Sequence, residues 1–144
     1  MKLFTIGFTR KTAERFFSTL KAAGVQRVVD IRLNNVSQLA GFAKRDDLCY
    51  FLATICGIDY IHVPELAPTR DLLDNFKKKK GDWAVYERTF NNLIAGRNIA
   101  RKYKGKIFDG DCLLCSEATP DHCHRRLVAE YLQKKWGGVD IVHL

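Results

Sequence analysis

The sequence predicts an α/β protein with three layers, in which a mainly parallel sheet of about five strands is flanked by helices. Short apolar runs rich in β-branched residues alternate with segments whose apolar residues recur every three or four positions. The first succession of strand, helix and strand takes about thirty residues, the length of a βαβ unit with a right-handed crossover. Both observations favour parallel strands covered by helices on both faces.

The first half of the chain contains three predicted strands and two predicted helices. A short buried strand at 3–6 comes before a helix that Thr12 caps and Gly24 ends, because threonine suits the N-cap and glycine a helix stop. The elements that follow are a strand at 28–31, a loop at 34–43, an amphipathic helix over 48–55 that ends at Gly57, and a strand at 60–63 that Pro64 stops.

The second half adds two strands and a set of helices. The predicted elements are a short helical turn at 71–76, a longer helix over 83–103 that Gly96 weakens, a strand at 112–115, a helix over 120–136 and a strand at 139–142. Thr119 and Pro120 predict the start of the last helix, since threonine suits the N-cap and proline the first helical position.

Length and composition indicate an ordinary globular protein. The 144 residues suit a single domain over 1–144, and 47% hydrophobic with 28% charged residues argues against disorder. No apolar run approaches the roughly 20 residues that span a bilayer, and the apolar N-terminus is too short for a signal peptide. Five cysteines, an odd number, favour reduced thiols over a disulfide framework. We therefore expect a cytoplasmic protein without membrane contact.

Small or polar residues lie at the carboxyl ends of four of the predicted strands. They are Gly7, the pair Asp30 and Arg32, the pair His62 and Glu65, and the pair Cys115 and Glu117. In parallel sheets, ligands bind outside the carboxyl ends of the strands. The sequence therefore predicts a polar site at this edge of the sheet.

Residues 111–126 carry an unusual density of reactive groups. An apolar run ends at Cys115, Glu117 follows, and the predicted helix start carries His124 and Arg125. A helix N-terminus favours anions and thiolates through its unpaired N–H groups and its dipole. We predict that Cys115, Glu117 and His124 are catalytic, with Cys115 as a nucleophile and Glu117 or His124 moving a proton. The alternative for Cys115 is a small buried core residue.

The same segment resembles a known family. Leu-Leu-Cys-Ser-Glu at 113–117 followed by Cys-His-Arg-Arg at 123–126 is similar to the signature of the domain of unknown function 488 family (DUF488). Three more stretches are similar to that family, namely Thr-Ile-Gly-Phe-Thr at 5–9, Val-Val-Asp-Ile-Arg at 28–32 and Tyr-Ile-His-Val-Pro-Glu-Leu at 60–66. The resemblance covers almost the whole chain. It implies one α/β domain with a polar site, and it implies no particular reaction.

A second group of residues is suited to an anion. Asp30 and Arg32 are separated by one residue, so their side chains share a face of the strand. We predict that Arg32 and Arg125 bind a phosphate or carboxylate while Asp30 orients Arg32. The alternative for Asp30 and Arg32 is a structural ion pair within the sheet, and the alternative for Arg125 is a surface charge.

Cysteines and a histidine in 112–124 also resemble a zinc ligand set. Cys112, Cys115, Cys123 and His124 are soft ligands in suitable number. Residues three apart on an extended strand face opposite sides, however, so Cys112 and Cys115 should diverge. A reduced set of Cys115, Cys123 and His124 stays open, and we predict no metal and no other cofactor.

The net charge of +8 comes from one segment. Residues 77–106 hold ten basic and two acidic residues, whereas 1–76 hold ten and eight and 107–144 hold four and six. Such an excess favours a polyanionic partner such as nucleic acid, although a solvated helix surface is the alternative. The predicted phosphate contacts are Lys77, Lys78, Lys79, Lys80, Arg97, Arg101 and Lys104.

Three functions fit these features. The first is an enzyme that acts on a phosphorylated or nucleic-acid-linked substrate at the polar site. The second is a nucleic-acid-binding module without catalysis, although no helix-turn-helix or other compact recognition motif is visible. The third is a cysteine-dependent enzyme similar to sulfurtransferases, suggested by Val-Asp-Ile-Arg at 29–32, or a zinc-binding domain. The longer interval between Cys115 and the helical arginine weakens the sulfurtransferase analogy.

Overall fold

A computed structural model describes all residues 1–144 and contains one parallel five-stranded sheet in the order β3-β2-β4-β1-β5. The strands are β1 (Lys2–Gly7), β2 (Arg27–Asp30), β3 (Asp59–His62), β4 (Asp111–Cys115) and β5 (Asp140–His143). The helices are α1 (Ala13–Ala23), α2 (Arg45–Phe51), α3 (Arg70–Lys77), α4 (Trp83–Gly96), α5 (Ile99–Lys102) and α6 (His124–Trp136). The predicted fold class is confirmed.

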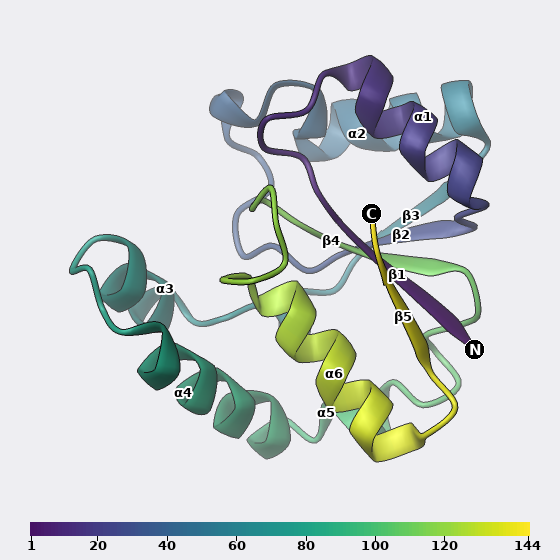
Figure 1. Ribbon diagram of the computed structural model, residues 1–144. Coiled ribbons are helices and arrows are strands. Elements are labelled where there is room, and N and C mark those ends of the chain that lie inside the picture. The colour runs from purple at the N-terminus through teal and green to yellow at the C-terminus, as the bar shows by residue number, and fades with distance from the viewer.

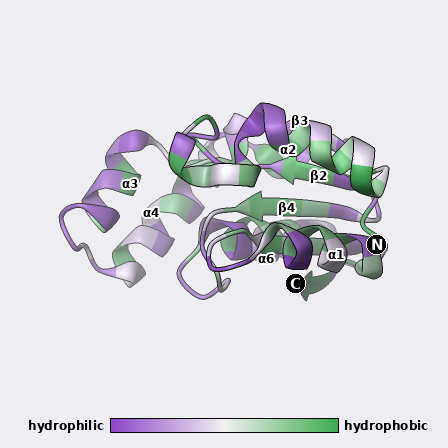
Figure 2. Ribbon diagram, turned by 90° about the horizontal axis from the view of Figure 1, so that it is seen from above, coloured by the Kyte–Doolittle hydropathy of each residue, from purple (hydrophilic) through white to green (hydrophobic).

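The helices form a layer on each face of the sheet (Figure 1). Alternate side chains of β4 point to opposite faces, so Leu113 joins the core under α4, α5 and α6, while Leu114 joins the core under α1 and α2. Figure 2 shows strands β2 and β4 coloured as hydrophobic over most of their length. Helix α3 has no fully buried residue, packs on α4 and extends past the carboxyl edge of the sheet.

The chain leaves β1 and β4 in opposite directions. After β1, helix α1 leads along one face toward β2, and after β4, helix α6 leads along the other face to β5. The two strands are neighbours, with Gly7 paired to Cys115 at their carboxyl ends. Such a switch point is where open α/β sheets bind ligands. Cys115 therefore ends the central strand at the most favourable position for a site.

Several predicted helix boundaries are confirmed and two need correction. Thr12 caps α1 and Gly24 ends it in the left-handed conformation. The predicted helix over 83–103 is divided, because Asn98 adopts a left-handed conformation (φ 57°) between α4 and α5. None of the helices has the length and apolar character needed to cross a membrane.

The start of α6 is the second correction. Thr119 and Pro120 do not begin the helix, which starts at His124 after an extended Cys123. Pro120 begins only a single turn, closed by the Cys123 N–H on the Pro120 carbonyl at 3.3 Å. The reason is a competing contact, since Arg125 donates to the carbonyl of Glu117 at 2.6 Å and holds the preceding residues as a loop.

Candidate functional site

Cys115 and His124 form a thiol–imidazole pair at the carboxyl end of β4. The Sγ of Cys115 lies 3.4 Å from Nδ1 of His124, and both residues are 6% exposed. Nε2 of His124 lies 2.7 Å from the carbonyl oxygen of Ile31, at the end of the neighbouring β2. Cys115 is the last residue of β4 and His124 is the first residue of α6. The loop between them folds back on itself and brings the two side chains together.

The carbonyl of Ile31 fixes the tautomer of His124. A carbonyl oxygen only accepts hydrogen bonds, so Nε2 carries the hydrogen in the neutral ring. Nδ1 is then the acceptor and faces the thiol of Cys115. This arrangement is suited to moving the thiol proton onto the imidazole.

The surroundings of Cys115 favour its thiolate. Burial raises the pKa of this thiol, but the Cys123 thiol, the backbone N–H groups of Ser116 and Glu117 and the charge of Arg125 outweigh burial, so the pKa lies below its ordinary value. Burial and the neighbouring Cys115 raise the pKa of Cys123 instead. The two thiols are therefore chemically distinct, with Cys115 the better nucleophile.

Arg125 lies beneath the site, away from solvent. Its side chain is fully buried, and its only hydrogen bond runs from Nη1 to the Glu117 carbonyl. Nε and Nη2 have no partner, and no carboxylate pairs with the guanidinium. Gly7 makes room for this contact, because a Cβ there would lie 1.6 Å from the Glu117 carbonyl oxygen. Arg125 thus supplies uncompensated positive charge near the end of β4.

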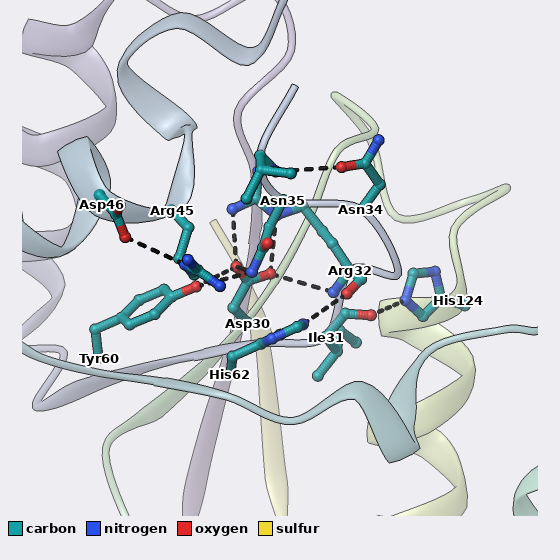
Figure 3. A network of polar contacts seen from close by, with 11 residues as sticks. Asp30, Ile31, Arg32, Asn34, Asn35, Arg45, Asp46, Tyr60, His62 and His124 are labelled. Carbon is teal, nitrogen blue, oxygen red and sulfur yellow. Dashed lines mark hydrogen bonds and ion pairs between the residues drawn. The ribbon is translucent and has the colours of Figure 1, made fainter. Parts of the chain in front are cut away.

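Asp30 and Arg32 form the buried ion pair that their spacing suggested (Figure 3). Nε and Nη2 of Arg32 each donate to one carboxylate oxygen of Asp30 at 2.8 Å, and the hydroxyl of Tyr60 donates at 2.5 Å. Burial opposes ionisation of Asp30, but these bonds and the charge of Arg32 keep its pKa below the ordinary value. Asp30 therefore orients Arg32 and leaves Nη1 of the guanidinium free.

A cavity of about 240 Å³ lies where the carboxyl edge of the sheet meets α3 and α4. The predicted site residues on its wall are Arg32, Lys77, Cys115, Glu117 and His124. Asp30 and Arg125, both fully buried, are not on the wall. The structure thus brings the predicted catalytic residues to one pocket, and it places Asp30 and Arg125 behind that wall.

Glu117 and Lys77 form an ion pair at the cavity. Both side chains are at least 40% exposed, so the pair is held weakly and either charge can turn to a ligand. Glu117 is not within hydrogen-bond distance of Cys115 or His124. Its predicted part as a proton carrier is therefore less direct than that of His124.

The basic segment 77–106 is partly engaged in contacts with its own chain. Arg97 donates to the carbonyls of Glu65 and Ala67, and Lys102 pairs with Glu65. Among the predicted phosphate contacts, Lys78 pairs with Asp74. Those exposed and without an ion pair are Lys79, Lys80, Arg101 and Lys104.

Three side chains could offer ligand atoms to a metal ion. Cys115, Cys123 and His124 are buried, and their ligand atoms all lie within 4.8 Å of one another. Cys112 is not among them, because its side chain packs in the core on the opposite face of the sheet, as the strand geometry predicted. This is the reduced set that the sequence left open.

Tyr86 and His122 are among the residues of the cavity wall that were not predicted as site residues. Tyr86 follows the apolar stripe of α4, and nothing in that pattern separates it from a core residue; burial and the neighbouring Cys115, Cys123 and Glu117 raise its pKa. His122 stacks on Trp83 with ring centres 4.9 Å apart. Its closeness to Cys123 in the sequence was the one available signal.

Comparison with known protein families gives a match to the model named Domain of unknown function DUF488, over residues 12–132. The chain belongs to the DUF488 family. The match includes Asp30, Arg32, Cys115, His124 and Arg125. Searches of curated proteins and of solved structures found no match to this DUF488 protein. Its chemistry must therefore be argued from its own site.

Proposed function

We propose that this DUF488 protein is a thiol-dependent enzyme, in which Cys115 attacks an electrophilic centre of a small anionic substrate. The observation that carries the proposal is the 3.4 Å contact between Sγ of Cys115 and Nδ1 of His124. A nucleophile next to a base that a third group orients is the arrangement of covalent catalysis. Here the third group is the carbonyl of Ile31.

The proposed reaction transfers a group through a covalent adduct on Cys115. Nδ1 of His124 takes the thiol proton and later gives it to the leaving group. Water or a second substrate then removes the transferred group from the sulfur. Arg125 stabilises the thiolate from below, because it is a buried cation without a carboxylate partner.

The anionic character of the substrate rests on Arg32 and Lys77. Arg32 lines the cavity. Its Nε and Nη2 donate to Asp30, whereas its Nη1 has no partner. Lys77 lines the same cavity, and its only ion pair is the exposed one with Glu117, which an anionic ligand can replace. A phosphate group, either of a small metabolite or at the end of a nucleic acid, fits two such cations.

Alkylation of the folded protein tests the nucleophile. We expect iodoacetamide to modify Cys115 at a lower pH than the exposed Cys49, which serves as an internal control of ordinary reactivity. Inorganic phosphate should protect Cys115 and leave Cys49 unaffected. His124→Gln should move the Cys115 profile toward that of Cys49. Modification of Cys115 only after unfolding would remove the basis of the proposal.

Turnover can be tested with p-nitrophenyl phosphate and p-nitrophenyl acetate, which separate phosphoryl from acyl transfer. Cys115→Ser should abolish any activity, and Cys112→Ser, three residues earlier on the same strand but on the other face, should retain it. Equal activity of the wild type and Cys115→Ser would show that the sulfur takes no part.

A second candidate uses the same side chains as metal ligands. The ligand atoms of Cys115, Cys123 and His124 are close enough to bind zinc, and all three residues line the cavity, from which a fourth ligand would have to come. The Ile31 carbonyl on Nε2 resembles the outer hydrogen bond that orients a metal-bound histidine. Metal content of the purified protein decides between the two, since stoichiometric zinc would occupy the thiol that the first proposal needs free.

A further inference from the structure

Cys123 is a second thiol within reach of the proposed nucleophile. It is 2% exposed, lines the same cavity as Cys115, and its sulfur lies within 4.8 Å of that of Cys115. Cys115 is the last residue of β4 and Cys123 directly precedes α6, so the two thiols stand at opposite ends of one loop, 116–122. That loop includes Glu117 and His122 of the cavity wall.

No other thiol of the chain is placed in this way. Cys49 is exposed on α2, and the thiol of Cys56 donates to the Phe17 carbonyl. Cys112 is fully buried on the opposite face of the sheet. Close approach of two thiols is therefore confined to the cavity.

We infer that Cys115 and Cys123 are a redox pair, in which Cys115 reduces a small hydroperoxide and Cys123 then closes a disulfide with it. The inference rests on the proposed nucleophilic character of Cys115. An accessible reactive cysteine beside a second thiol is the arrangement in which oxidation proceeds reversibly to a disulfide, and here both sulfurs border one cavity within 4.8 Å of each other. The pair adds peroxide reduction to the reactions proposed for the site. It also gives Cys123 a chemical step of its own, which the proposed group transfer does not.

The two steps balance in atoms and electrons. The Cys115 thiolate attacks one oxygen of ROOH, the O–O bond breaks, and the sulfur is oxidised by two electrons to the sulfenic acid. His124 gives the proton taken from the thiol to the leaving alkoxide, which departs as ROH. The Cys123 sulfur then attacks the Cys115 sulfur, and hydroxide leaves with the Cys123 proton as water. The sum is ROOH and two thiols to ROH, water and one disulfide.

The enclosure of the site restricts the oxidant to a small molecule. Cys115 is 6% exposed and is reached through a cavity of about 240 Å³. A protein disulfide is too large to approach its sulfur directly, whereas hydrogen peroxide or a short alkyl hydroperoxide is not. The disulfide would also take the Cys115 sulfur from His124, so group transfer should stop until a dithiol reduces the bond.

The test uses hydrogen peroxide on the reduced, metal-free protein, followed by peptide mass spectrometry without reduction. We expect a Cys115–Cys123 peptide pair that lacks two hydrogen atoms, and its disappearance after dithiothreitol. In Cys123→Ser, dimedone should instead trap a sulfenic acid on Cys115. Cys112→Ser is the matched control and should form the disulfide as the wild type does.

The outcomes separate this inference from the proposed function. If iodoacetamide modifies Cys115 readily but peroxide leaves a sulfenic or sulfinic acid on it in the wild type, the redox pair is wrong and the nucleophile stands. If neither reagent reacts with Cys115 in the folded protein, both are wrong. A disulfide that joins any other two cysteines also overturns the pair.

Discussion

At the scale of single residues, Arg125 is the side chain that most needs an explanation. Its guanidinium is fully buried, two of its nitrogens have no hydrogen-bond partner, and no carboxylate pairs with it. Such burial is unfavourable, because removing a charge from water costs on the order of several kcal/mol. The thiolate that we propose at Cys115 would supply the missing negative charge. The opposite charges of these two buried groups would then stabilise each other, which accounts for an arginine buried without a carboxylate.

This pairing predicts how Arg125 affects the thiol. In Arg125→Met, the pKa of Cys115 should rise, because burial continues to raise it while one opposing charge is gone. Alkylation of Cys115 near neutral pH should become several-fold slower, with a profile moved to higher pH. Arg125→Lys keeps the charge and should move the profile less. Identical profiles for both variants would show that charge is not the cause.

The buried pair of Asp30 and Arg32 predicts an effect on stability. Arg32→Met leaves a buried carboxylate without its cation and should destabilise by about 3–5 kcal/mol at neutral pH. The matched control is Arg45→Met, which removes an exposed arginine paired with Asp46 and should cost at most about 1 kcal/mol. Urea unfolding of both variants measures the difference; similar losses would contradict the assignment of Asp30 as a buried ionised group.

The same pair predicts a dependence on pH. The folded pKa of Asp30 lies below the unfolded value, so its stabilising contribution is complete above the unfolded pKa of about 3.9 and is lost as pH falls through the folded pKa. The stability difference between wild type and Arg32→Met should therefore shrink in acid. A difference that stays constant down to acid unfolding would exclude ionised Asp30 as the source.

At the scale of secondary-structure elements, the sequence predicted the strands and the first helix closely. Their patterns are local, as in the β-branched run of β2 and the Thr12 and Gly24 caps of α1. The start of α6 was wrong because Thr119 and Pro120 are good local signals that a distant contact overrides. The Arg125 bond to the Glu117 carbonyl exists only once β1, β4 and α6 have assembled.

The candidate site shows the same division. Strand ends located Arg32 and Cys115, since the carboxyl ends of parallel strands meet at one edge. The 3.4 Å contact of Cys115 with His124 depends on how residues 116–122 fold between the strand and the helix, and no periodic pattern in the sequence predicts that. Tyr86 was missed because a tyrosine in an apolar helical stripe is identical in sequence to a core residue.

Close contact between elements makes Gly7 a sensitive position. A Cβ at Gly7 would lie 1.6 Å from the Glu117 carbonyl oxygen, so Gly7→Ala must displace the loop after β4 and should destabilise by at least about 1–3 kcal/mol. Gly96→Ala, at the end of α4, is the control, because a Cβ added at Gly96 would have nothing within 4 Å. Alanine there should stabilise the helix by about 0.5–1 kcal/mol. Thermal unfolding should give shifts of opposite sign.

At the scale of the whole molecule, the excess positive charge lies in one segment that starts at the cavity. Lys77 is on the cavity wall, and the other nine basic residues of 77–106 follow it along the chain through α4 and α5. Arg97 contacts the segment after β3 through the carbonyls of Glu65 and Ala67, and Lys102 contacts it through an exposed ion pair with Glu65. The exposed residues without an ion pair, among them Lys79, Lys80, Arg101 and Lys104, are the ones suited to phosphate groups.

This distribution predicts binding to nucleic acid through phosphate contacts that do not read the sequence. Affinity should fall steeply as salt rises, because each neutralised phosphate releases counterions. Replacing Lys79, Lys80, Arg101 and Lys104 together by alanine should weaken binding and flatten its salt dependence. The matched control is Lys134→Ala with Lys135→Ala at the end of α6, outside the segment, which should leave both unchanged. Retention of single- and double-stranded nucleic acid at two salt concentrations measures this. Absence of binding at low salt, or equal losses in the two variants, would leave the basic segment as a solvated surface.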